Sequence, residues 1–128
     1  MIKNIRYKIN NLNIEKRAFI NGVYVNSIDK KTIDKNSSID GRDISGLSAC
    51  NGKDIDVAVE GALESYSSRV WVDLVPIEKQ KIILKLADLI ERNIEELALL
   101  DTLETGRSLR NYYYDSIPKA VKTIRWFA

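Results

Sequence analysis

The stretch of residues 75–109 constrains the fold of this 128-residue chain more than any other. Its apolar residues recur at intervals of three and four, which places them on one face of an α-helix. Pro76 suits the first turn of such a helix, and Gly106 can adopt the left-handed conformation that ends one. We therefore predict a helix, or a pair of helices, over residues 76–105, whose apolar face needs a partner surface. The apolar positions are Ile82, Leu86, Leu89, Ile90, Ile94, Leu97, Leu100 and Leu103.

A second helix is predicted over residues 54–66. Asp54 can cap its N-terminus, because the carboxylate can accept a backbone N–H and lies at the positive end of the helix. Gly61 costs about 1 kcal/mol relative to alanine, so this helix depends on packing. In the connector that follows, we expect Trp71 to pack between helices. The apolar stripe of the helix comprises Ile55, Ala58, Val59, Ala62, Leu63 and Tyr66.

A last helix is predicted over residues 117–128, with Pro118 in its first turn. It remains apolar up to Ala128 and contains no residue that signals a helix end. Because chain termini are usually polar and exposed, we expect this ending to cut through a larger fold.

Short strands are predicted between residues 18 and 50. Asn21-Gly22 is a strong hairpin signal between the apolar residues of 19–20 and 23–25. Asp40-Gly41 is a second turn signal, with short strands expected near 31–36 and 43–50.

Charge is unevenly distributed along the chain. Residues 1–35 carry eight Lys and Arg against three Asp and Glu, whereas residues 36–128 carry twelve against fifteen. We interpret residues 1–17 as a flexible or loosely docked basic N-terminal arm, and favour a solvated tail over an arm that docks on a surface. The net charge of +2 is too small to favour a nucleic-acid partner.

The sequence also indicates a location. No apolar run approaches the roughly 20 residues that span a bilayer, and the N-terminus lacks the pattern of a secretory signal. One cysteine cannot form an intrachain disulfide, which fits a reducing compartment. We expect a cytoplasmic protein without a membrane partner.

The residue types needed for common active sites are scarce. The chain has no histidine, so neither a serine triad nor a Cys/His pair can form. One cysteine without histidine also excludes a Cys/His zinc site. Cys50 could act as a nucleophile only beside a cationic group that lowers its pKa, and we expect a structural role for it.

Three other patterns suggest sites and are better explained by structure. Gly41 and Gly46 have the spacing of a phosphate loop, but the following Lys and helix are missing. Glu91, Glu95 and Glu96 lie beside Arg92 and Lys85, as on a solvated helix face. The rings of Tyr112, Tyr113 and Tyr114, near Arg107 and Arg110, point in different directions, so packing is favoured over base stacking. No residue gains a catalytic role from these patterns.

Several motifs nevertheless occur in a distinctive order along the chain. They are F-I-N-G-V-Y-V (19–25), D-I-D-V-A-V-E-G-A (54–62), P-I-E-K-Q-K-I-I-L-K-L-A-D-L-I-E (76–91), E-E-L-A-L-L-D-T-L-E-T-G-R-S-L (95–109) and I-P-K-A-V-K-T-I-R-W-F-A (117–128). This order resembles the N-terminal part of NAD(P)-dependent aldehyde dehydrogenases, and the resemblance covers residues 17–128. The ending I-R-W-F-A, with Trp71 upstream, looks most like the branch that acts on γ-glutamyl-γ-aminobutyraldehyde and related amino aldehydes.

The resemblance implies an α/β enzyme, of which this chain would supply a β-hairpin region (18–50) and three or four helices of the cofactor-binding region. Such enzymes oxidise an aldehyde through a thiohemiacetal on a cysteine. Hydride passes to NAD or NADP, and a glutamate-activated water hydrolyses the thioester. By this resemblance the catalytic and cofactor-binding residues all lie beyond Ala128, and Cys50 is not the nucleophile. No catalytic, cofactor-binding or metal residue is therefore assigned, and no cofactor is expected to bind this chain alone.

Two features depart from the family pattern, and a third position is of interest. The family usually has Asn-Pro-x-Thr-Gly in its second hairpin region, where this chain has Asn36-Ser-Ser-Ile-Asp-Gly41. Val75 replaces the helix-capping Ser or Thr before Pro76, so capping falls to Asp73 or to nothing, at a cost of about 1 kcal/mol. Some members bind a structural cation through an acidic residue where this chain has Ser116, with Asp115 adjacent, and no such site is claimed.

Two functions follow from these observations. The first is an N-terminal fragment of an aldehyde dehydrogenase, an oxidoreductase in its full-length form, that is inactive alone and has no aldehyde substrate of its own. The alternative is a non-enzymatic module that self-associates or binds a full-length homologue through exposed apolar helix faces. A nucleic-acid partner is not expected.

Overall fold

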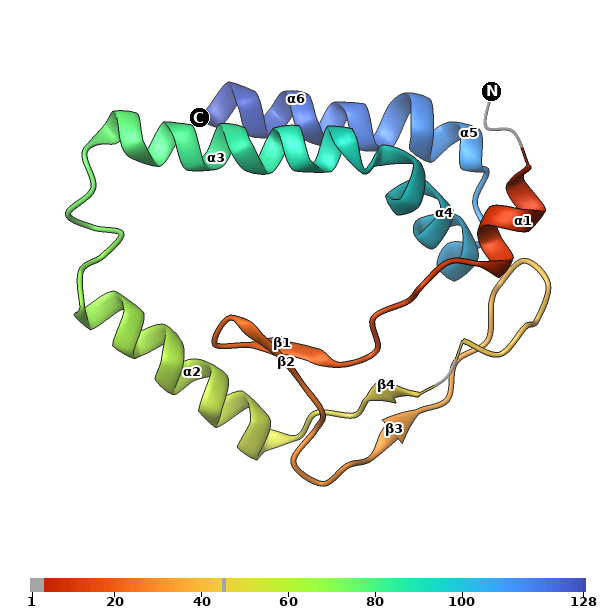
Figure 1. Cartoon of the computed structure of the whole chain (residues 1–128), viewed down its shortest axis with the longest axis horizontal. Coiled ribbons are helices and arrows are strands. Elements are labelled where there is room, and N and C mark those ends of the chain that lie inside the picture. The colour runs from red at the N-terminus through yellow and green to blue at the C-terminus, as the bar shows by residue number, and fades with distance from the viewer. Residues whose placement is uncertain (1–3, 45) are drawn as a thin grey trace. The chain divides into compact units, whose positions relative to one another are not determined.

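The computed structural model describes residues 4–44 and 46–128 and contains two compact units. The helical unit comprises the described part of Met1–Ile14, together with Ser37–Gly41 and Val75–Ala128. The hairpin unit comprises Glu15–Asn36 and the described part of Arg42–Leu74. Figure 1 labels the α-helices and strands of both.

The predicted helical stretch 76–105 is a pair of helices. Helix α3, Pro76–Arg92, ends at Asn93, and helix α4, Ile94–Thr105, begins directly after it. The Asn93 side-chain amide donates to the carbonyl oxygen of Leu89 at 2.8 Å, so it stabilises the end of α3. Gly106 ends α4 with φ of 73°, the left-handed conformation predicted for it. Val75 precedes α3 without a side-chain cap.

The last helix follows an irregular turn. The short helix α5, Leu109–Asn111, continues into the π-helix η1, Tyr112–Ser116, and then into α6, Ile117–Phe127. Helix α6 packs along α3 (Figure 1). The core of the unit contains Ala87 and Ala98, both fully buried, with Ile117 and Val121. The small side chains of the two alanines allow the helices to approach closely.

Part of the basic arm is helical and docked, rather than a solvated tail. Within it, residues Ile5–Asn10 form helix α1, and the Lys8 ammonium forms an ion pair with Glu95 of α4. The local sequence could not indicate this contact, because Glu95 lies 87 residues away. Residues 1–3 of the predicted arm lie outside the described residues.

The hairpin unit begins with the predicted β-hairpin. Strands β1, Ala18–Ile20, and β2, Val23–Val25, are antiparallel, with Ala18 opposite Val25. Asn21 and Gly22 have φ values of 52° and 81°, as the two central residues of a type I′ turn require. The Asn-Gly prediction is confirmed.

The next two strands are shorter than predicted. Strands β3, Thr32–Ile33, and β4, Leu47–Ser48, pair antiparallel, and a further bridge joins Asn36 to Asp43. Ser45, in the predicted strand 43–50, lies outside the described residues. Gly41 has φ of 67°, which agrees with the second turn signal.

Helix α2, Gly52–Ser67, begins two residues earlier than predicted, and Asp54 is not its N-cap. Asn51 holds that position, and its side-chain oxygen accepts the Lys53 N–H at 2.8 Å. Asp54 completes a capping box by accepting the Asn51 N–H at 2.8 Å. It is only 2% exposed and also accepts the Ile28 N–H at 2.8 Å, which joins the preceding loop to the helix.

The prediction for Trp71 is wrong for this chain. Trp71 lies in the connector after α2 and is 44% exposed, so no pair of helices encloses it. Across the described ranges, no helix is both long enough and apolar enough to cross a membrane.

Candidate functional site

The structure does not gather the candidate chemical groups into one centre. The Cys50 thiol is exposed just beyond β4, so it does not contribute to a core in the way a structural cysteine would. Gly41 and Gly46 have φ of 67° and 91°, and the short strand β4 rather than a helix directly follows them, so no helix N-terminus stands behind these glycines as a phosphate loop requires. Over residues 4–44 and 46–128, no group of three His, Cys, Asp or Glu residues could hold a metal ion.

The glutamates of the helical unit form ion pairs that connect helices. Glu91 and Asp88 of α3 each accept from the Arg125 guanidinium of α6 at 2.7 Å. These hydrogen bonds, first from Asp88 and then from Glu91, raise the pKa of Arg125. Glu95 belongs to α4 and pairs with Lys8. The interpretation of this cluster as structural is therefore supported by its partners.

The tyrosines of η1 serve packing rather than a shared binding face. Tyr112 and Tyr113 are half-buried against the core of the helical unit. The Tyr112 hydroxyl lies 3.0 Å from that of Thr105, and the Arg107 guanidinium lies over the Tyr112 ring at 5.9 Å. Tyr114 contacts Tyr113 edge-on, with ring centroids 4.8 Å apart. The rings thus point in different directions, as the sequence predicted.

Asp115, beside the position of a family cation site, forms an ion pair with Lys119 at 2.7 Å. This pair lies one helical turn apart at the start of α6 and needs no metal to balance its charge. The structure therefore gives no reason to assign a cation there.

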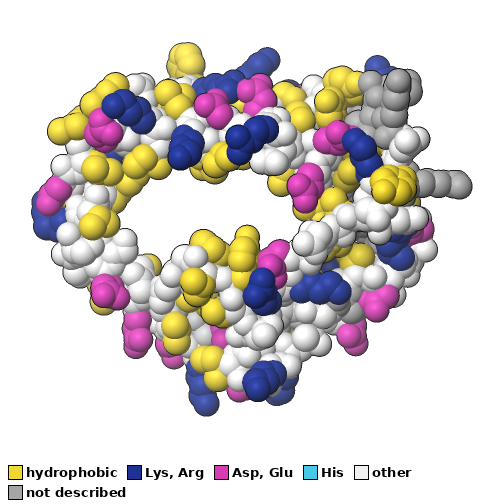
Figure 2. All heavy atoms as spheres, viewed as in Figure 1, with side chains coloured by type: hydrophobic (Ala, Val, Ile, Leu, Met, Phe, Trp, Pro, Cys, Tyr) yellow, Lys and Arg dark blue, Asp and Glu magenta, His cyan; other side chains and the backbone are white. Residues whose placement is uncertain are grey.

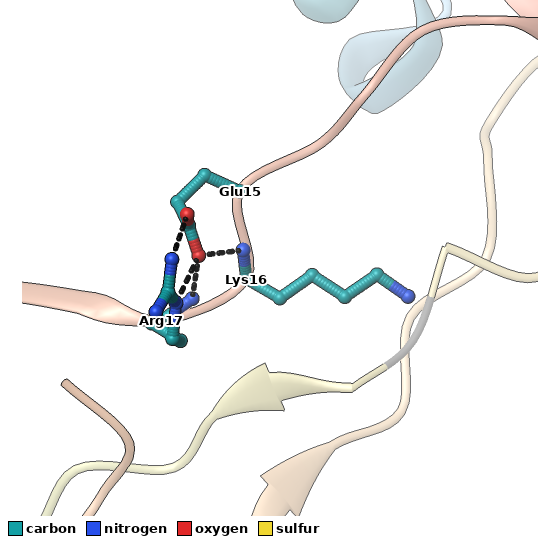
Figure 3. A network of polar contacts seen from close by, with 3 residues as sticks. All are labelled: Glu15, Lys16 and Arg17. Carbon is teal, nitrogen blue, oxygen red and sulfur yellow. Dashed lines mark hydrogen bonds and ion pairs between the residues drawn. The ribbon is translucent and has the colours of Figure 1, made fainter. Parts of the chain in front are cut away.

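A polar network precedes β1 in the hairpin unit (Figure 3). The Glu15 carboxylate accepts the Arg17 Nε–H at 2.8 Å and an Nη2–H at 2.7 Å, and it also accepts the backbone N–H of Lys16 and of Arg17 at 3.0 Å. The side-chain hydrogen bonds from Arg17 are the main reason why the pKa of Glu15 falls to about 2. The Arg17 guanidinium also lies 5.5 Å from the Tyr24 ring, so this network fixes the entry to the hairpin.

A groove of about 680 Å³ lies between the β1–β2 turn and α2. Gly61 forms part of its lining, and a Cβ at that position would lie 1.8 Å from the Asn21 side-chain oxygen. Glu64 supplies the one ionisable side chain among the described residues that line it. We therefore interpret the groove as a result of the close packing of the turn on the helix, and not as a reaction centre.

Exposed apolar side chains are the main unexplained feature of the surface (Figure 2). On α3 the residues Ile82, Leu86 and Leu89 are exposed, whereas Ile90 packs on the core beside α6. We call these three residues the α3 face. They belong to the predicted apolar stripe, whose remaining part is covered within the helical unit. At the end of α6, Trp126 is 83% exposed and Phe127 is 79% exposed.

The hairpin unit has a comparable surface. Four residues of α2 at intervals of four, four and three are all more than half exposed, and we call them the α2 stripe: Ile55, Val59, Leu63 and Tyr66. Contiguous apolar surface on a soluble protein indicates a contact with another surface. These faces, rather than a set of reactive groups, are the candidate functional features.

Comparison with known proteins assigns the class of this fold. The sequence profile of the aldehyde dehydrogenase family matches residues 24–128. The chain belongs to the aldehyde dehydrogenase family, whose members are NAD(P)-dependent oxidoreductases.

Individual relatives agree with this assignment. The NADP/NAD-dependent aldehyde dehydrogenase PuuC of Escherichia coli is 36% identical over 117 residues, which cover 91% of this chain and 24% of PuuC. The indole-3-acetaldehyde dehydrogenase AldA of P. syringae, solved with NAD+, is 34% identical with a TM-score of 0.93, over 96% of this chain and 25% of AldA. The γ-glutamyl-γ-aminobutyraldehyde dehydrogenase of Burkholderia cenocepacia is 31% identical with a TM-score of 0.93, over 97% of this chain and 25% of that protein.

The chain thus spans about a quarter of the length of the relatives that it matches. The α/β fold class that the sequence implied by resemblance agrees with these neighbours, and the chain contains their hairpins and first helices.

Proposed function

We propose that this chain supplies the N-terminal region of an enzyme that oxidises an aldehyde to a carboxylic acid with NAD or NADP. The observation that carries the proposal is the match of fold and sequence over almost the whole chain, with a TM-score of 0.93 to an NAD+-bound aldehyde dehydrogenase. The chain's own part in that activity is structural: its helices and hairpins form a scaffold for a cofactor domain and a catalytic domain.

A chimera tests this proposal directly. The matching quarter of the E. coli relative is replaced by this chain, and the purified chimera is assayed for aldehyde-dependent NADH formation. We expect a soluble enzyme whose activity exceeds that of the relative with the same quarter deleted. A chimera that folds, as judged by circular dichroism, but forms no more NADH than the deletion would contradict the proposal.

We further propose that the chain alone is inactive, because the ionisable groups described above form ion pairs and caps rather than a reactive cluster. The test uses the purified 128-residue chain with NAD+ or NADP+ and a panel of aldehydes. The expected rate of NADH or NADPH formation equals that of a sample without protein, while the E. coli relative serves as the positive control. Aldehyde-dependent reduction of either cofactor by the chain would overturn this expectation.

The amino-aldehyde branch is the finer proposal for the substrate. It is supported by the ending I-R-W-F-A and by the similarity to the γ-glutamyl-γ-aminobutyraldehyde dehydrogenase of B. cenocepacia. In a second chimera, built in the same way on the indole-3-acetaldehyde dehydrogenase AldA, kcat/KM is compared for γ-glutamyl-γ-aminobutyraldehyde and indole-3-acetaldehyde. A change of preference relative to the parent enzyme, towards the first substrate, is the expected result. If the ratio of the two kcat/KM values is unchanged, this chain does not contribute to the substrate specificity of the enzyme.

A second candidate function is that of a module that binds a full-length homologous subunit. The exposed α3 face and the exposed end of α6 favour it. The test is co-expression of the tagged chain with the untagged E. coli relative, followed by affinity purification. Leu86→Asp should abolish co-purification, whereas Lys85→Asp, an exposed charged neighbour, should not. A chain that remains a monomer, melts cooperatively and retains no subunit would exclude this function.

A further inference from the structure

We draw no further inference here: the strongest candidate, the exposed apolar α2 stripe of Ile55, Val59, Leu63 and Tyr66 in the hairpin unit, carries nothing because nothing in the structure shows what covers it.

Discussion

Glu15 shows how a short local network can set the charge of a single residue. Its side chain is 38% exposed to solvent, and both carboxylate oxygens accept hydrogen bonds from the Arg17 guanidinium two residues away. These bonds favour the ionised form and lower the pKa of Glu15 from its ordinary value of 4.5 to about 2. Because the pair is exposed, its effect on stability is small and is screened by salt.

A pH dependence follows from that shift. Because the pKa of Glu15 is lower in the folded chain, the carboxylate stabilises the fold above about pH 4.5, and this contribution is lost as the pH falls towards 2. Glu15→Gln should therefore lower the urea midpoint at neutral pH and have no effect near pH 2. Arg17→Gln should raise the pKa of Glu15 in an NMR titration of the carboxyl carbon. A Glu15 pKa near 4.5 in the unmodified chain would contradict the network.

Gly61 is the other residue whose identity is set by a specific contact. In an exposed helix, Gly→Ala should gain about 1 kcal/mol. Here the new Cβ would lie 1.8 Å from the Asn21 Oδ1 and 2.5 Å from its Cγ. Asn21 lies in a left-handed conformation at the hairpin turn, so its side chain, the turn or the helix must shift when the methyl group is added.

We therefore expect Gly61→Ala to destabilise the chain by about 1–3 kcal/mol, the usual cost of overpacking. In the background of Asn21→Gly, which keeps the turn conformation and removes the obstructing side chain, Gly61→Ala should instead be stabilising. The free energy of unfolding is measured by urea titration for all four chains as a double-mutant cycle. Additive effects of the two substitutions would show that the contact is not formed.

Among the secondary-structure elements, α2 shows how a helix start is decided by more than its own residues. Asp54 faces the loop before the helix as well as the helix itself, because it accepts N–H groups from Ile28 and Asn51. Asn51 in turn donates to Asp29 at 2.7 Å. The sequence indicates a capping residue here. Only the fold shows that the start of the helix is held by the carboxylates of Asp54 and Asp29 together with the side-chain amide of Asn51.

Asp54→Ala should lower the free energy of unfolding by about 2 kcal/mol, because two backbone N–H groups in part-buried hydrogen bonds would lose their charged acceptor. Asp56→Ala is the matched control: it removes an exposed carboxylate from the same turn of α2 and should change the stability by less than about 0.5 kcal/mol. Thermal or urea unfolding followed by circular dichroism measures both. Equal effects of the two substitutions would show that Asp54 acts only through its charge.

Over the whole molecule, the distribution of apolar side chains is the feature with the clearest consequence. Each unit has its own contacts, yet the α3 face, the α2 stripe and the end of α6 remain exposed. Burying one Leu or Ile side chain contributes about 1.5–3 kcal/mol. Several such side chains on one helix therefore provide a strong driving force for association.

We expect the isolated chain to self-associate as its concentration rises, measured by sedimentation velocity. The double substitution Ile82→Lys and Leu86→Lys on the α3 face should shift the distribution towards monomer without loss of helical content. Ala87→Lys, directed into the core between the helices, should instead unfold the helical unit. If the double variant associates as strongly as the unmodified chain, the α3 face is not the contact.

The sequence by itself determined the elements whose causes are local. The Asn-Gly turn, the left-handed Gly106 and the periodic helices follow from backbone sterics and from the spacing of apolar residues, which need no distant partner. The order of the motifs was also sufficient to identify the aldehyde dehydrogenase family, and the family match over residues 24–128 confirms this identification. The absence of histidine alone excludes a serine triad and a Cys/His pair, because both need an imidazole as the base.

Only the tertiary structure shows the contacts between residues that lie far apart in the chain. The ion pair of Lys8 with Glu95, the hydrogen bond from Ile28 to Asp54 and the obstruction of Gly61 by Asn21 all join distant segments. The sequence also could not show which part of the apolar stripe on α3 is covered by α6. Periodicity identifies an apolar face, but the division of that face into buried and exposed parts depends on the shape of the surface packed against it.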